Sequence, residues 1–200
     1  MFKIMNQKLN KTNRMLILVV ALLMFLVYFL PLWYVNLSAP QYPETLGMYI
    51  YINDIRGKTP HDLQNINLLN HYIGMQKIAA DSIPELQYMP YILGYMIIGA
   101  IVAFFINRIY MVLLGIINTI LVGIAGLYDF WRWEYNYGHN LSPDAPIKVP
   151  GMSYQPPLIG CKELLNITAC SWPHIGGILL FLVVGILFWI WYKEYKESES

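Results

Sequence analysis

Four long apolar runs divide the chain into segments of membrane-spanning length and polar segments between them. The runs lie at residues 15–35, 88–106, 109–127 and 174–192. A helix that crosses about 30 Å of hydrocarbon needs roughly 20 apolar residues, so each run is long enough to span a bilayer. Because only Asn107 and Arg108 separate the second run from the third, these two form a tight hairpin. The pattern predicts four transmembrane helices.

The first polar segment, residues 36–87, contains signals for a strand and a helix. Apolar side chains alternate with Gly47, Tyr49 and Tyr51 between residues 46 and 52, which predicts a short strand followed by a turn. Thr59 and Pro60 are typical of a helix start. Apolar residues at helical spacing follow, and Gly74 suits the end of this helix.

The second polar segment, residues 128–173, is rich in proline and in apolar and aromatic residues. Proline prevents long helices, so we expect an ordered, irregular structure that packs on the first segment. Ser171 is expected to cap the fourth span. The fold class predicted is an all-α integral membrane protein with four transmembrane helices and a small mixed, partly irregular extracytoplasmic cap.

Composition and charge exclude other classes. Apolar residues make up 57% of the 200 residues and charged residues only 12%, whereas a soluble domain carries roughly 25% charged residues. Thirteen Lys and Arg stand against twelve Asp and Glu. This near-balance removes the electrostatic basis for binding nucleic acid.

The basic residues orient the chain. Residues 1–14, Arg108 and residues 193–200 together hold seven of the thirteen basic residues in three short stretches: Lys3, Lys8, Lys11, Arg14, Arg108, Lys193 and Lys196. The positive-inside rule then places both termini in the cytoplasm of a bacterial inner membrane and both loops in the periplasm. The first run is longer than a signal-peptide core and no A-x-A site follows it, so we interpret it as an uncleaved anchor.

The spans themselves carry no ionisable residue in their central parts. Such residues mark ion paths and proton relays, so the sequence argues against a pump, channel or proton-coupled transporter acting alone. Gly115, Thr119 and Gly123 form a small-residue seam. This seam is typical of close helix packing, either within the bundle or against a partner membrane subunit.

Histidine and methionine in the outer loops suggest copper. His71 and Met75 are four residues apart, so a continuing helix would place both on one face. Imidazole and thioether together suit Cu(I), and His139, Met152 or a cysteine would complete such a site from the second loop. The alternative is ordinary packing, with Gly74 ending the helix between the first two residues.

Other candidate groups have plainer interpretations. Cys161 and Cys170 enclose eight residues, and a disulfide, a copper-thiolate pair and two free thiols all stay open. The absence of C-x-x-C-H predicts no covalent c-type haem. Asp129, Arg132 and Glu134 follow the third span, and we expect an interfacial salt bridge there, not catalytic groups.

Several phrases in the outer loops resemble a known family. They are SAPQYPETLGMYIYINDIRG, DLQNINLLNHYIGM, IPELQYMP and YDFWRWEYNYGHNLSPDAPIKVPGMSYQPPLIG. Together they resemble the small four-span membrane protein, NosB-like, encoded in clade II nitrous oxide reductase (nos-type) gene clusters. The resemblance implies an accessory role in making or sustaining this periplasmic copper enzyme. It implies no ligand set for particular residues.

The function expected is therefore that of a non-enzymatic membrane accessory protein for nitrous oxide reductase, handling Cu(I) on its outer face. Its partners would be the reductase or its copper chaperones, other nos-type membrane proteins and the lipid bilayer. Two alternatives stay open. One is a membrane anchor or electron-supply component that links quinol or cytochrome c to the reductase, and the other is a purely structural subunit.

Overall fold

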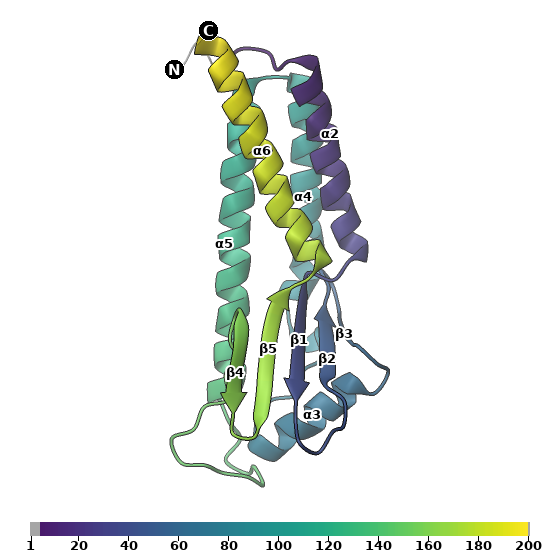
Figure 1. Cartoon of the computed structure of the whole chain (residues 1–200), viewed down its shortest axis with the longest axis vertical. Coiled ribbons are helices and arrows are strands. Elements are labelled where there is room, and N and C mark those ends of the chain that lie inside the picture. The colour runs from purple at the N-terminus through teal and green to yellow at the C-terminus, as the bar shows by residue number, and fades with distance from the viewer. Residues whose placement is uncertain (1–4, 200) are drawn as a thin grey trace.

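Four long helices stand side by side at one end of the molecule, and a mixed α/β cap lies at the other (Figure 1). This computed structural model describes residues 5–199, so Lys3, used above to orient the chain, and Ser200 lie outside it. We use "cap" for residues 30–84 and 128–174. The start of the first helix and the end of the last lie together, away from the cap (Figure 1).

The helical bundle consists of elements that are each long and apolar enough to cross a membrane. They are α2 (Lys11–Leu26), which continues into the 3₁₀ turn η1 (Val27–Phe29), α4 (Glu85–Ile106), α5 (Ile109–His139) and α6 (Ile175–Glu199). Helix α2 packs against α4 and α6, and α5 packs against α6 and α4. The predicted four spans are therefore present as helices, and the hairpin at Asn107 and Arg108 lies between α4 and α5 as expected.

Buried polar contacts join the first and last helices at the end opposite the cap. One carboxylate oxygen of Glu194 accepts hydrogen bonds from Asn13 Nδ2 at 2.7 Å and from the backbone N–H of Asn10 at 2.9 Å. Asn10 also caps α2, because its side chain accepts from Asn13 N at 2.8 Å. These contacts fix the register of α2 against α6.

The cap contains a five-stranded sheet, so the all-α prediction holds only for the bundle. The strands are β1 (Trp33–Ser38), β2 (Leu46–Ile50), β3 (Ile55–Gly57), β4 (Gly160–Leu164) and β5 (Ile167–Pro173). Their order is β3-β2-β1-β5-β4, and every neighbouring pair is antiparallel. Strands β1 and β5 form the central pair of the sheet. They join the two polar segments, 36–87 and 128–173, which the sequence analysis described separately.

The predicted end of the first span and the predicted cap of the fourth are wrong, because residues at both places belong to the sheet. The first span was expected to reach Val35, but the chain is extended from Leu30 onward and β1 begins at Trp33. Proline at position 31 disfavours a helical residue before it. Ser171 does not cap the fourth span, because β5 continues to Pro173.

The junction between sheet and bundle is close-packed. The backbone N–H of Gly176 donates to Pro31 O at 2.8 Å, and His174 N donates to Leu32 O at 2.9 Å. A Cβ atom on Gly176 would lie 2.8 Å from Pro31 O, so this position needs glycine. The start of α6 is thereby held against the end of the first span.

Helix α3 (Asp62–Ile73) begins two residues later than Pro60, the start expected from the sequence. The carboxylate of Asp62 is buried, accepts a hydrogen bond from Gly47 N at 2.8 Å and also accepts from the Thr59 hydroxyl. Burial alone would raise the pKa of Asp62, but the hydrogen bonds from Thr59 and Gly47 outweigh it and lower that pKa. Asp62 thus ties the first turn of α3 to β2.

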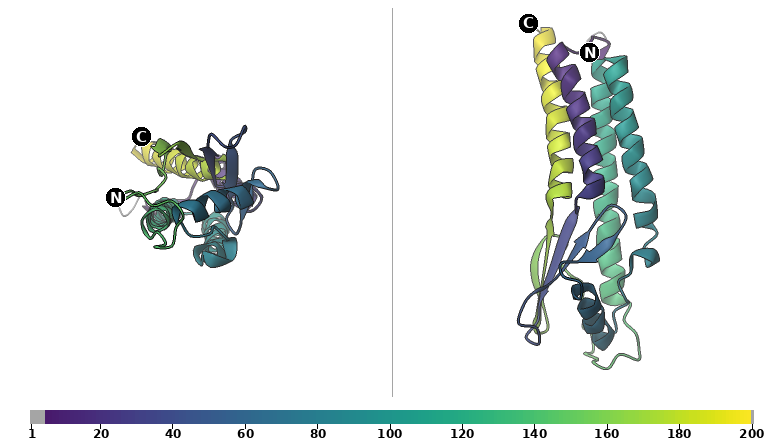
Figure 2. Two further views of the ribbon diagram at one scale, coloured as in Figure 1. Left: turned by 90° about the horizontal axis from the view of Figure 1, so that it is seen from below. Right: turned by 90° about the vertical axis from the view of Figure 1, so that its right-hand side faces the viewer.

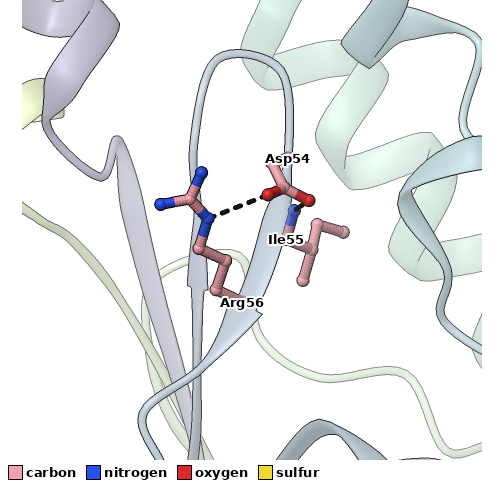
Figure 3. Close-up of polar contacts among 3 residues, drawn as sticks. All are labelled: Asp54, Ile55 and Arg56. Atoms are coloured by element: carbon pink, nitrogen blue, oxygen red, sulfur yellow. Dashed lines mark hydrogen bonds and ion pairs between the residues drawn. The ribbon is translucent and has the colours of Figure 1, made fainter. Parts of the chain in front are cut away.

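The hairpin between β2 and β3 is closed by Asp54 (Figure 3). One of its carboxylate oxygens accepts from Ile55 N at 2.8 Å, and the other pairs with Arg56 Nε at 2.8 Å. The Arg56 guanidinium also lies 4.6 Å from the centre of the Tyr51 ring. The Arg56 side chain is 60% exposed and that of Asp54 is 36% exposed, so water screens this pair, which shapes the turn and adds little stability.

The core of the cap lies between one face of the sheet and the helices α3 and α5 (Figure 2). Trp33, Val35 and Met48 point to this side, where Ile66 of α3 and Tyr137 of α5 meet them. The 3₁₀ turn η2 (Ala80–Ser82) then leads into α4. The cap is thus one packed unit built from both loops.

Candidate functional site

Helix α5 carries functional side chains from the bundle into the cap. The apolar run that the sequence assigned to the membrane ends at Leu127, but α5 continues without a break to His139. In this outer part the Phe130 ring lies 5.5 Å from the Trp33 ring, and Trp133 lies 4.4 Å from Tyr137. The predicted loop at residue 128 is therefore helical for its first twelve residues.

A cavity of about 180 Å³ lies within the cap, between the sheet, α3 and α5. Val35 and Met48 line it from the sheet, Leu69 and Asn70 from α3, and Glu134 from α5. Most of the other lining side chains are aliphatic or aromatic. Among the described residues, the lining contains no Ser, Cys, His, Lys or Arg, so its chemistry suits binding more than covalent catalysis.

Unpartnered buried polar atoms gather at this cavity. Within residues 5–199, eight buried side-chain polar atoms have no hydrogen-bond partner in the chain, and five of them belong to four cavity-lining residues. These five atoms are Asn70 Nδ2, Trp133 Nε1, both carboxylate oxygens of Glu134 and the Tyr154 hydroxyl. Because each such group costs about 1–3 kcal/mol, their concentration at one place marks a candidate binding site.

Glu134 is the charged group of this site. Its side chain is 1% exposed, and it lies beyond the apolar part of α5, inside the cap. Burial raises the pKa of Glu134 to about 8, because the charged form loses its hydration and gains no cation. Glu134 is therefore mostly protonated at neutral pH and can donate a hydrogen bond.

The irregular segment 140–159 forms one wall of the cavity through Ile147, Tyr154 and Pro156. Backbone hydrogen bonds hold this wall in place. Ser142 N donates to Gly74 O at 2.8 Å, Ile147 N to Tyr72 O at 2.9 Å, and Tyr154 N to Gly138 O at 2.9 Å. A Cβ atom on Gly138 would lie 2.4 Å from Gln155 N, so the wall can approach α5 only at a glycine.

The four candidate copper ligands lie in different environments. Helix α3 ends at Ile73, and Gly74 is left-handed with φ of 82°, so His71 and Met75 do not share a continuing helix face. His71 and His139 are exposed, and His139 Nδ1 lies 2.9 Å from Tyr135 O. Met75 lines the cavity, whereas Met152 lines a shallow neighbouring pocket that shares Ile73, Ile147 and Tyr154 with it.

Within residues 5–199, no three or more His, Cys, Asp or Glu side chains gather closely enough to hold a metal ion. Met75 and Met152 line two adjacent hollows, which share the lining residues Ile73, Ile147 and Tyr154.

The two cysteines form a disulfide in the structure. Cys161 of β4 and Cys170 of β5 are directly opposite each other across the antiparallel pair. The bond closes the outer β-hairpin, whose residues Leu164 and Ile167 line the cavity. It therefore supports one side of the candidate site.

Sequence reasoning did not identify Glu134 as a site residue. It predicted a salt bridge between Asp129 and Arg132 and gave Glu134 beside them no separate role, but no ion pair joins any two of these three described residues. The available signal was the spacing of Phe130, Glu134 and Tyr137, which share one face if the helix continues. Nothing between residues 127 and 137 is Gly or Pro, so continuation was the better prediction.

Comparison with known proteins assigns no family to the chain. No protein-family model matches the chain, and no curated protein is similar to it in sequence.

Proposed function

We propose that this protein is a non-enzymatic membrane accessory protein that supports a periplasmic nitrous oxide reductase, with the cap as its working part. The resemblance of the outer-loop phrases to the NosB-like family suggests this role. One structural observation supports it. The phrases at residues 38–57, 62–75 and 128–160 lie far apart in sequence, but each supplies part of the lining of one cavity: Met48 of β2, one face of α3, and the outer part of α5 with the wall that follows it. Strands β1, β4 and β5 complete the lining.

The proposed contact surface for the reductase is the outer edge of the cap. Tyr72, Ile147 and Leu165, which we call the rim, line the cavity and are 45%, 47% and 43% exposed. Exposed apolar side chains that cluster at one place are typical of protein interaction sites. In this proposal both termini are cytoplasmic, and the cap faces the periplasm where the reductase is found.

In this proposal the two methionines, Met75 and Met152, are the copper ligands. Thioether sulfur favours Cu(I), and Met75 and Met152 lie on neighbouring hollows at the end of α3. Exposed His71 and His139 would receive or release the ion at the surface. Copper would thus be held weakly and passed on, not kept as a resident cofactor.

Deletion of the gene in its host tests the proposal. The reductase made without this protein is purified, and copper per reductase is counted. A copper-poor reductase that regains copper when the wild-type gene is restored would support a role in maturation. A fully loaded reductase that works with artificial reductants but fails in cells would instead indicate electron supply, and the copper proposal would fail.

Variants restored into the same deletion strain make the test specific. Met75→Ala/Met152→Ala is expected to leave the reductase copper-poor, whereas Met15→Ala, on an exposed face of α2, is the matched control. Tyr72→Ser/Leu165→Ser tests the rim separately, through co-purification with the reductase. Normal copper loading with the methionine variant would remove these two residues as ligands.

A further inference from the structure

The cavity of the cap has the size of a small-molecule site. Its volume is about 180 Å³, somewhat larger than an engineered cavity of about 150 Å³ that binds benzene. It therefore accommodates one substituted ring. The rim residues Tyr72, Ile147 and Leu165 both line it and are exposed, so it opens to the outside between them.

The polar atoms in the cavity determine which kind of head group fits. The indole N–H of Trp133 and the amide N–H of Asn70 are donors only, and the Tyr154 hydroxyl donates as well. Glu134 adds a further donor, because burial raises its pKa to about 8 and keeps it protonated at neutral pH. The unpartnered buried atoms thus offer four donors against two acceptors, the phenol oxygen of Tyr154 and the second oxygen of protonated Glu134. An acceptor head group therefore satisfies more of them than a donor does.

Charged head groups fit less well. An anion would meet no cation, since no Lys, Arg or His is found among the described lining residues. An amine would pair with Glu134 but would leave the donors of Trp133 and Asn70 unsatisfied. A carbonyl oxygen is uncharged and has two lone pairs, so it accepts two of these donors at once.

We propose that the cavity binds a small uncharged ring compound through a carbonyl oxygen, which accepts hydrogen bonds from Glu134 and from the indole N–H of Trp133. The apolar body of the ligand packs between Val35, Met48 and Leu69. This inference does not rest on the proposed accessory role. It is carried by the co-location of the unpartnered donors in one apolar cavity.

Three probes of nearly the same size separate the alternatives. Acetophenone carries a carbonyl oxygen, ethylbenzene replaces this group with an apolar one, and benzylamine carries a cation. The full chain is placed in lipid nanodiscs with ¹⁵N-labelled tryptophan, and the indole N–H signal of Trp133 is assigned as the one missing in Trp133→Phe. Because this signal comes from the site itself, probe molecules that dissolve in the lipid do not change it.

Acetophenone is expected to move the Trp133 signal downfield in a saturable way at pH 7. Ethylbenzene is expected to bind about tenfold or more weakly, because a buried hydrogen bond is lost. The Glu134→Gln variant keeps a neutral donor and should bind acetophenone within about threefold of the wild type. Glu134→Leu removes the donor and should weaken binding about tenfold.

Matched controls keep the result interpretable. Trp131→Phe removes an exposed neighbour on α5 that does not line the cavity, and it should leave acetophenone binding unchanged. The remaining indole signals, above all that of Trp33 in its buried hydrogen bond to Ser171, report whether each variant is folded.

Three results would overturn the inference. Equal affinity for acetophenone and ethylbenzene would show an apolar cavity with no head-group recognition. Tightest binding of benzylamine, lost in Glu134→Gln, would show a cation site. No saturable shift of the Trp133 signal with any probe, in a protein whose Trp33 signal is intact, would show that the cavity holds only water.

Discussion

The indole N–H of Trp33 donates a hydrogen bond of 2.7 Å to the hydroxyl oxygen of Ser171, and both side chains are buried. Trp33 begins β1, just after the first span, and Ser171 lies near the end of β5, just before the last. The bond therefore links the two central strands at the level where they leave the bundle. It holds together parts of the chain that are 138 residues apart.

Replacement of Ser171 by Ala is expected to destabilise the protein by about 1–3 kcal/mol, because it leaves the buried indole N–H of Trp33 without a partner. Equilibrium unfolding in mixed micelles measures this loss. A double-mutant cycle with Trp33→Phe should give a coupling energy of about 1 kcal/mol. Ser38→Ala, at the exposed outer end of β1, is the control and should change stability by less than about 0.5 kcal/mol.

Glu134 should make stability fall as pH rises. The pKa of a free glutamate is 4.5, and burial raises that of Glu134 to about 8. The folded state therefore binds more protons than the unfolded state between these values, and stability declines across this window by on the order of 5 kcal/mol. Glu134→Gln should remove most of this decline and should exceed the wild type in stability at pH 9.

Thermal unfolding at a series of pH values between 5 and 9 measures the effect. The other ionisable side chains that line the cavity are those of Tyr72, Tyr137 and Tyr154. Glu163→Gln, an exposed glutamate on β4, is the matched control and should keep the wild-type slope. The same slope in Glu134→Gln would show that Glu134 is hydrated or paired.

The disulfide should contribute about 2–3 kcal/mol, the value that chain entropy gives for a closed loop of about ten residues. Cys161→Ser/Cys170→Ser should lower the unfolding midpoint without changing helix content, because the bond lies in the β4–β5 hairpin only. Circular dichroism and denaturant titration measure the two quantities. Reduction of the wild type should reproduce the shift, and the double serine variant should not respond to reductant.

Asp62→Asn should destabilise the cap by about 1–3 kcal/mol, because Gly47 N and the Thr59 hydroxyl donate to different carboxylate oxygens and an amide replaces one of these with an N–H donor group. The hydrogen bonds lower the pKa of Asp62 below its usual value of 3.8. Its contribution is therefore complete above this value and is lost as pH falls through the lower pKa of the folded state. Asp54→Asn, in the exposed pair with Arg56 (Figure 3), is the control and should cost less than about 1 kcal/mol.

Local sequence pattern was sufficient to predict the helices of the bundle and some elements of the cap. Four apolar runs of adequate length predict four helices, and the two-residue break at Asn107 fixes the hairpin of α4 and α5. Alternation around Met48 predicts a strand, and β2 lies there. In each case the information lies within about twenty neighbouring residues.

The pairing of strands that are far apart in the sequence could not be predicted from local pattern. An apolar stretch such as Trp33 to Val35 suits a membrane helix and a buried strand equally, and only pairing with β5 decides between them. The partner strand lies in a loop whose prolines suggested irregular structure. The cavity follows from this pairing, because the sheet forms one of its walls.

The pairing of β1 with β5 also sets an order of events during synthesis. Strand β1 leaves the ribosome roughly 130 residues ahead of β5, which corresponds to about 7–26 s at typical elongation rates. During this interval one edge of β1 has no partner strand, and its backbone N–H and C=O groups are open to other chains. The sheet closes only after α5, the third of the four long helices, has been made. A nascent chain that stalls before residue 167 therefore leaves one edge of β1 unpaired and open to whatever assists its assembly.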